Sequence, residues 1–71
     1  MYLTRINPSR NEFRFFHAHL DCDLLGDWTL VREHGRIGSP GTLRLVAFDS
    51  EHAAVEALAM LMQRRAKRGY R

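Results

Sequence analysis

The sequence predicts a two-layer α+β domain, in which an antiparallel sheet of about four strands carries one long C-terminal helix on one face. Three observations lead to this prediction. Residues 2–48 form a series of β-compatible segments separated by turn-forming residues. Residues 50–67 carry apolar side chains at helical spacing. The connections between segments are short, which favours antiparallel neighbours.

The first two strands are predicted on either side of a tight turn. Residues 2–6 alternate in the manner of a strand, and the turn formers of residues 7–11 end it. Residues 12–20 form the second strand, which is rich in phenylalanine. Strand parity gives this second strand two faces, with Phe13, Phe15, His17 and His19 on one and Arg14, Phe16, Ala18 and Leu20 on the other.

The second pair of strands follows a loop at residues 21–26. The third strand is predicted over residues 27–37 and the fourth over residues 43–48. Between them, residues 39–42 read Ser-Pro-Gly-Thr and fit a type II turn. Proline suits the second position of this turn, and glycine suits the third, where φ is positive.

The helix is predicted over residues 50–67. Ser50 or Asp49 is expected to cap its N-terminus, and Gly69 to end it. Glu51 lies in the first turn, where the helix dipole favours an acid. The apolar stripe expected to face the sheet consists of Ala54, Val55, Leu58, Leu61 and Met62.

Length and composition bound the class of protein. A chain of 71 residues is expected to form a single domain over residues 1–71 with one small core. No apolar run approaches the ~20 residues of a membrane span, and the N-terminus lacks the apolar segment of a signal peptide. The lone Cys22 cannot form an internal disulfide. These features favour a cytoplasmic protein.

The positive charge is concentrated near the C-terminus. The net charge is +3, but residues 1–63 contain six basic and eight acidic side chains, and residues 64–71 contain five basic ones. The helix dipole modestly stabilises cations in the last turn. Cations at this density also repel one another and are stabilised by an anion, such as phosphate or an acidic protein surface. The residues concerned are Arg64, Arg65, Lys67 and Arg68.

A second basic segment lies at the end of the third strand. Gly35 and Gly38 have no Cβ, so another backbone or a ligand can approach closely there. Arg36, between them, presents five donors in a planar fork that suits phosphate or carboxylate. Unless a bulge intervenes at Gly35, one face of the sheet holds Arg32, His34 and Arg36, with Arg44 on the neighbouring strand. These side chains either bind an anion or shield the open side of the sheet with their stems.

The chain resembles the WGR domain family over nearly its whole length. The resemblance rests on the segment REHGRIGSPG, on Asn11-Glu12-Phe13, on Phe48, on the helix with Ala53 and Ala54, and on Arg68-Gly69-Tyr70. The family is best known from DNA-dependent poly(ADP-ribose) polymerases and also occurs in short bacterial proteins. The resemblance implies a one-helix architecture and non-catalytic binding of nucleic acid, DNA in particular.

The resemblance also implies a site. Arg36 matches the arginine that looks to be the family's main DNA-contacting residue, whereas His34 occupies the position of the family's tryptophan. In DNA-binding members that tryptophan packs against the sugar at a DNA end, and His34 is expected to stack more weakly. The full set of expected nucleic-acid-binding residues is His34, Gly35, Arg36, Arg32, Arg44, Arg64, Arg65, Lys67 and Arg68. Any effector that responds to binding is expected to be a separate protein.

A protein-interaction module is the main alternative, either docking an acidic partner on the basic patch or associating with itself. His17 and His19 share a strand face, but no second motif completes a metal site. Catalysis and cofactors are not expected, because Cys22 has no evident base and no carboxylates are paired. Trp28 is expected to pack in the core or on the sheet.

Overall fold

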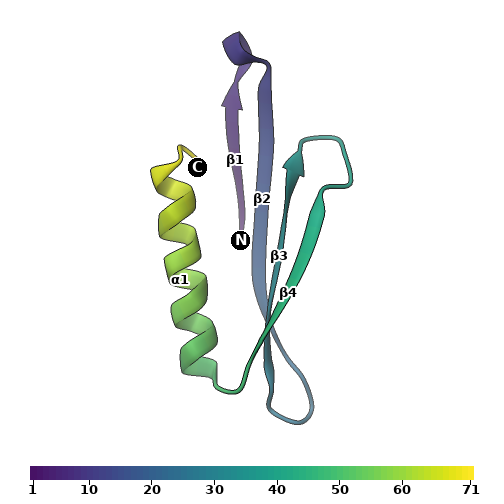
Figure 1. Ribbon diagram of the computed structural model, residues 1–71, viewed down its shortest axis with the longest axis vertical. Helices are drawn as coiled ribbons and strands as arrows, with labels where there is room; N and C mark the ends of the chain where they lie inside the picture. Colours follow the sequence, from purple (N-terminus) through teal and green to yellow (C-terminus); the bar gives the residue numbers. More distant parts are fainter.

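The computed structural model describes residues 1–71 and confirms the predicted α+β architecture (Figure 1). One antiparallel sheet has the strand order β1-β2-β3-β4. A single helix, α1, packs against β2, β3 and β4. The bounds are β1 (Tyr2–Asn7), a 3-10 turn η1 (Pro8–Arg10), β2 (Glu12–Cys22), β3 (Trp28–Arg36), β4 (Thr42–Phe48) and α1 (Glu51–Lys67).

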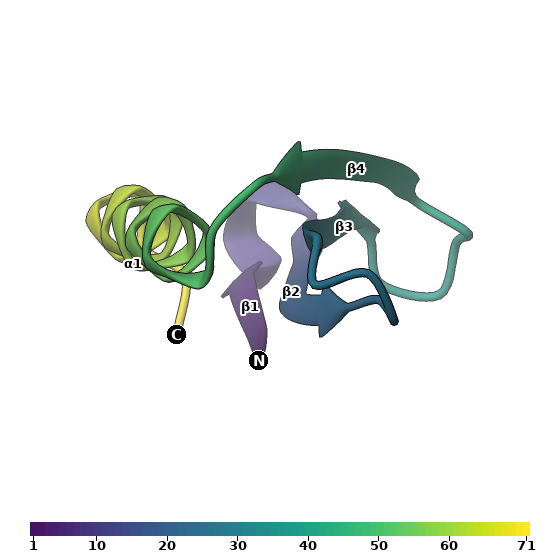
Figure 2. The same ribbon diagram turned by 90° about the horizontal axis from the view of Figure 1, so that it is seen from below.

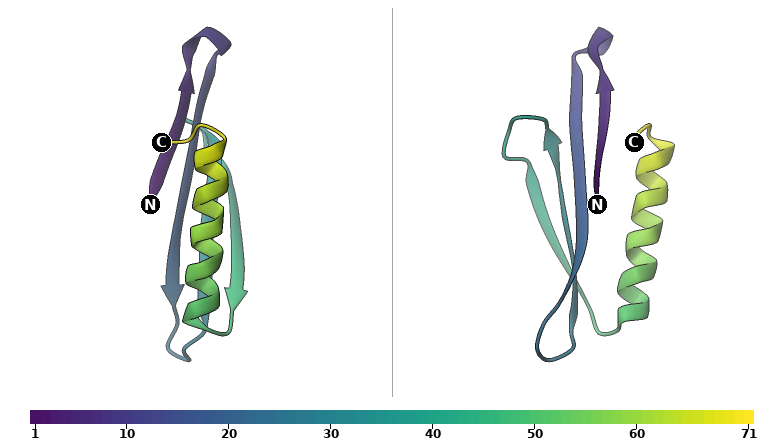
Figure 3. Two further views of the ribbon diagram at one scale, coloured as in Figure 1. Left: turned by 90° about the vertical axis from the view of Figure 1, so that its left-hand side faces the viewer. Right: turned by 180° about the vertical axis from the view of Figure 1, so that it is seen from behind.

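The helix lies lengthwise on one side of the sheet, and the other side is uncovered (Figures 2 and 3). We call these the helix side and the open side. A core cluster on the helix side joins sheet and helix, and consists of Phe16, Ala18, Leu30, Leu61 and Tyr70. Of the predicted apolar stripe, Ala54 and Leu61 are buried, and Leu58 and Met62 are half-buried. Val55 was predicted wrongly, because it is 48% exposed.

Both ends of α1 are capped as predicted. Ser50, rather than Asp49, caps the N-terminus, and its hydroxyl accepts a hydrogen bond from the amide of Ala53 at 3.2 Å. At the other end Gly69 has a φ of +89°. Its amide donates to Ala66, and the amide of Tyr70 donates to Arg65, which together form a Schellman motif. This turn directs Tyr70 back into the core.

The pairing of β2 with β3 runs without a bulge from Arg14 opposite Arg36 to Cys22 opposite Trp28. Because directly paired residues share a face, Arg32 and His34 of β3 lie on the helix side with Ala18 and Phe16, and Arg44 lies there opposite Arg32. The possibility that these arginines shield the open side of the sheet is therefore wrong for Arg32 and Arg44.

The bounds of β1, β3, β4 and α1 agree with the prediction to within one residue, but the end of β2 and the β3–β4 turn differ from it. Asp21 and Cys22 extend β2 instead of belonging to the following loop. Between β3 and β4, Gly41 has the expected positive φ of +76°, but the hydrogen-bonded turn lies earlier in the chain. There the amide of Ser39 donates to the carbonyl of Arg36 at 3.0 Å.

Close contacts on the open side require glycine at positions 35 and 41. At Gly38, by contrast, the predicted close approach of a backbone is not found, and the positive φ of +91° is what favours glycine. A Cβ on Gly35 would lie 2.7 Å from the Cα of Gly41. A Cβ on Gly41 would lie 2.7 Å from the carbonyl oxygen of His34 and 2.8 Å from the ring of Phe15. The turn thus bends over Phe15 and buries it, although Phe15 lies on the side that the helix leaves uncovered. The sequence predicted that either another backbone or a ligand comes close to Gly35, and the structure shows a backbone there.

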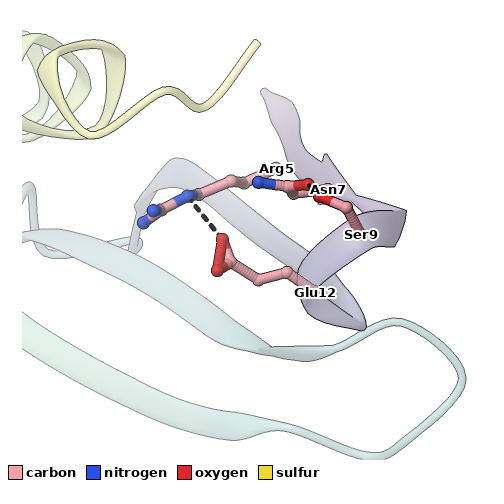
Figure 4. A network of polar contacts seen from close by, with 4 residues as sticks. All are labelled: Arg5, Asn7, Ser9 and Glu12. Atoms are coloured by element: carbon pink, nitrogen blue, oxygen red, sulfur yellow. Dashed lines mark hydrogen bonds and ion pairs between the residues drawn. The ribbon is translucent and has the colours of Figure 1, made fainter.

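The β1–β2 end projects beyond the last turn of α1 (Figure 1). Polar contacts hold it together, as Figure 4 shows. The guanidinium of Arg5 in β1 lies 2.8 Å from the carboxylate of Glu12 in β2. The hydroxyl of Ser9 donates to the side-chain oxygen of Asn7 at 2.7 Å. Arg5 therefore already has an acidic partner.

Candidate nucleic-acid interface

The helix side of the sheet changes from apolar to cationic along the strands. Near the start of α1 its rows are apolar, with Trp28 opposite Phe48 and Leu30 opposite Val46. Trp28 is half-buried there, as sheet-face packing predicts. Towards the other end the rows contain Arg32 opposite Arg44, and then Arg14 opposite Arg36. Since α1 runs in the same direction as β3 (Figure 1), its basic last turns lie at the cationic end of the sheet, where Arg64, Arg65 and Arg68 line one hollow with Arg32.

Arg32 lies at the centre of these cations. Its Nε atom is buried and has no hydrogen-bond partner. Burial lowers the pKa of the Arg32 guanidinium, and the nearby Arg65, Arg44 and Arg64 lower it further. A lowered pKa means that the surroundings disfavour the positive charge. Arg32 therefore has no acceptor for its Nε and no acidic partner.

The helix supplies the rest of the cluster. Arg64, Arg65 and Arg68 line a hollow of about 120 Å³ together with Arg32 and Leu61. Arg64 and Arg68 are exposed, whereas Arg65 is half-buried. We call Arg32, Arg44, Arg64, Arg65 and Arg68 the arginine cluster.

Aromatic rings hold Arg65 in place. Its guanidinium carbon lies 4.4 Å from the centroid of Phe16 and 5.3 Å from that of Tyr70. These distances are typical of cation–π contacts. The two rings meet edge to face with centroids 6.5 Å apart. Arg65 is thus preorganised by the core, and its ordering cost is met before any ligand binds.

His34 lies beside the cluster, opposite Phe16 on β2 and Thr42 on β4. Burial lowers the pKa of its imidazole first, and neighbouring cations add to the effect. Those cations are Arg65, Arg32, Arg44 and Arg14. His34 is accordingly neutral at pH 7 and can donate one hydrogen bond or stack its ring.

Arg36 lies apart from the cluster. Its two terminal nitrogens donate to the main-chain oxygen and the side-chain oxygen of Asn11, at 3.1 and 3.2 Å. Its guanidinium carbon lies 5.6 Å from the centroid of Phe13. Arg36 therefore fastens the end of β3 to the start of β2, although its side chain is exposed.

Two further residues complete the comparison with the predicted site. Lys67 is exposed and does not line the hollow. Arg14 was not predicted to belong to the site, yet it lowers the pKa of His34 and so lies close to it. Strand parity already placed Arg14 on the face of Phe16, which was the signal that could have identified it.

No acid neutralises the arginine cluster. The ion pairs of the protein join Arg5 to Glu12, His19 to Asp21 and His52 to Glu56, so none involves a cluster residue. Several like charges held together without a counter-charge form a site that an anion stabilises. Since guanidinium groups match oxyanions in geometry, phosphate or carboxylate is the suitable ligand class.

Other kinds of site receive less support from the structure. His17 and His19 have ring centroids 5.4 Å apart, and His19 lies 3.3 Å from the carboxylate of Asp21. No group of three or more His, Cys, Asp or Glu side chains is arranged to hold a metal ion. The single helix is not long and apolar enough to cross a membrane.

Comparison with known proteins identifies the family. The WGR domain family model matches residues 1–71. The uncharacterized protein y4dW of Sinorhizobium fredii (strain NBRC 101917 / NGR234) is 38% identical over 71 residues, which are 100% of this chain and 35% of that protein. No solved structure matches the chain. Because the family model covers the chain from end to end, this protein belongs to the WGR domain family.

Proposed function

We propose that this protein binds nucleic acid without catalysing a reaction, by placing arginine side chains against the phosphate backbone. The observation that carries the proposal is Arg32, whose buried Nε has no acceptor and whose charge has no acidic partner. A backbone phosphate beside Arg32 supplies the negative charge that this group of cations lacks. Membership of the WGR domain family is consistent with a nucleic-acid-binding module.

The arginines have different parts in this proposal. Arg32 and Arg65 are held by the fold, so they form the fixed base of the phosphate site. Arg64 and Arg68 are exposed and can move to meet the strand. Phosphate contacts of this kind carry no sequence information, so we expect affinity with little base preference.

The site implied by the family resemblance borders the arginine cluster, and we propose that it contributes contacts at DNA ends. Asn11 engages two donors of Arg36, and the guanidinium carries five, so donors remain for a phosphate. His34 offers a ring where the family has tryptophan, with less area for stacking.

Fluorescence anisotropy with four labelled ligands tests the proposal. The ligands are a duplex with a 5′-phosphate, the same duplex without it, a single DNA strand and an RNA strand. We expect binding of all four at low ionic strength, with Kd values of about 1–100 µM at physiological salt. Absence of binding to every one of them, even at low salt, would rule out the proposal.

A protein-interaction module is the second candidate, and the open side of the sheet favours it. Leu45 is 65% exposed there, Leu43 58% and Tyr2 56%, so apolar side chains face solvent on that side. Exposed apolar patches often mark contacts with proteins. Light scattering during gel filtration tests self-association, and a monomer at all concentrations would leave only a different protein as the partner.

A further inference from the structure

An apolar groove adjoins the arginine cluster on the helix side. Its volume is about 230 Å³, and it lies between α1 and the strands β3 and β4. Six apolar residues line it: Leu30, Val46, Phe48, Ala57, Met60 and Leu61. Val46 is 39% exposed and Met60 51% exposed, so the groove is open to solvent along its rim.

The groove and the arginine-lined hollow are continuous. Arg32, Leu61 and Arg64 line both of them. The anion site therefore passes directly into an apolar surface with no acidic side chain among the lining residues. A ligand that fits both parts has an anionic group joined to a compact apolar ring or chain.

We propose that the groove holds the base of one unpaired nucleotide, while the phosphate of that nucleotide lies among Arg32, Arg64, Arg65 and Arg68. This inference rests on the proposed function and deepens it, because it states that the site prefers an unpaired nucleotide to a paired one. Charge complementarity selects the phosphate, and the adjoining apolar walls select a flat ring attached to it. A duplex with both ends blunt offers the phosphate but keeps its bases stacked inside.

The lining suits a base better than a larger group. Pockets for drug-sized ligands measure about 300–1,000 Å³, so this groove is of a size for a single ring system. Phe48 offers an aromatic surface, and the polarisable sulfur of Met60 makes favourable contacts with rings. Because the groove is open, the polar edges of the base remain in water. We therefore expect a preference for unpaired over paired nucleotides, with no preference among the four bases.

The ligand-side test uses the native protein and three duplexes with the same number of phosphate groups. One is blunt and carries an added terminal phosphate, one ends in a single-nucleotide overhang without a terminal phosphate, and one has the same overhang with an abasic sugar in place of the nucleotide's base. We expect the overhang with its base to bind about fivefold tighter or more than the abasic one. The abasic overhang should bind like the blunt duplex. Equal affinity for the two overhangs would overturn the proposal.

The protein-side test fills the groove without changing an arginine. The variant Ala57→Phe places a ring in the groove, and Val55→Phe adds the same ring at a position that does not line it. We expect Ala57→Phe to bind the overhang with its base no more tightly than the abasic overhang, and to keep the native affinity for the blunt duplex. Val55→Phe should still bind the overhang with its base more tightly than the abasic one. If Ala57→Phe fails to fold, comparing the two overhangs on the native protein still shows whether the base contributes to binding.

The outcomes separate this inference from the proposed function. If the native protein binds none of the duplexes, the proposed function itself is wrong. If it binds all three equally and Ala57→Phe changes nothing, only the groove assignment is wrong. Equal binding of the duplexes, combined with groove-dependent binding of an acidic peptide that carries one leucine, would assign the groove to a protein partner and overturn the proposal.

Discussion

At His34, burial and the charges of neighbouring residues shift the pKa in the same direction. Both lower its pKa in the folded protein, so the unfolded chain holds this proton at a higher pH. The stability linked to this difference is present above about pH 6.5, the unfolded value, and is lost as pH falls below it towards the folded pKa. We expect the free energy of unfolding to decline from pH 7.5 to pH 5.5 more steeply in the native protein than in His34→Gln.

Urea unfolding at several pH values measures this slope. Gln63→Asn is the control, because Gln63 is exposed on α1 and does not titrate. It should show the native slope. An identical slope in His34→Gln would mean that neither burial nor the neighbouring cations lower the pKa of His34.

Two residue-level features could not be predicted from the sequence. Arg36 was correctly seen as an arginine flanked by glycines, but its partner Asn11 is 25 positions away in the sequence. Similarly, the absence of Cβ atoms at Gly35 predicted a close approach without showing what approaches. Gly41 and Phe15 fill that space only because the β3–β4 turn bends over the open side.

At the scale of elements, the helix was predictable because its caps and its period both appear in the sequence. Its exact orientation was not, because Val55 is as apolar as the residues that are buried. Successive residues of a helix differ by about 100°, so the stripe can be rotated by one position without breaking the pattern. Packing against the sheet centres the buried face on Ala54 and Leu61.

This orientation makes a prediction about stability. Leu61 is 6% exposed, so Leu61→Ala should lower the free energy of unfolding by about 2–5 kcal/mol, through lost burial and a cavity. Val55→Ala, on the exposed flank, should change it by less than about 0.5 kcal/mol. Thermal or chemical denaturation followed by circular dichroism measures both. Equal losses in the two variants would show that α1 is rotated from this orientation.

The two faces of the sheet were also predictable only in part. Parity correctly grouped Arg32, His34 and Arg36 on one face, since alternation fixes which residues share a side. It could not tell which side the helix covers, because β2 carries phenylalanine on both faces. The juxtaposition of Arg32 with the basic end of α1 therefore became visible only in the fold.

At the scale of the whole molecule, the two sides of the sheet differ in character. The helix side ends in arginines without acidic partners, and the open side exposes apolar residues such as Leu45. The Cα trace measures 47 × 24 × 13 Å, so the protein is a thin slab with little interior. A protein of this shape has little room for an enclosed site. The arginines of the cationic surface suit an oxyanion ligand such as phosphate or carboxylate.

The salt dependence of DNA binding tests the central claim most directly. For duplex DNA, the logarithm of the affinity falls with the logarithm of the salt concentration, with a slope of about −0.9 for each phosphate contacted. The double variant Arg32→Gln/Arg64→Gln removes two cluster cations. Arg10→Gln removes a charge from the projecting β1–β2 end (Figure 1). We predict that the double variant binds more weakly and has a slope shallower by about 1.8, whereas Arg10→Gln keeps the native slope. A double variant with the native slope would contradict the assignment of the arginine cluster to phosphate.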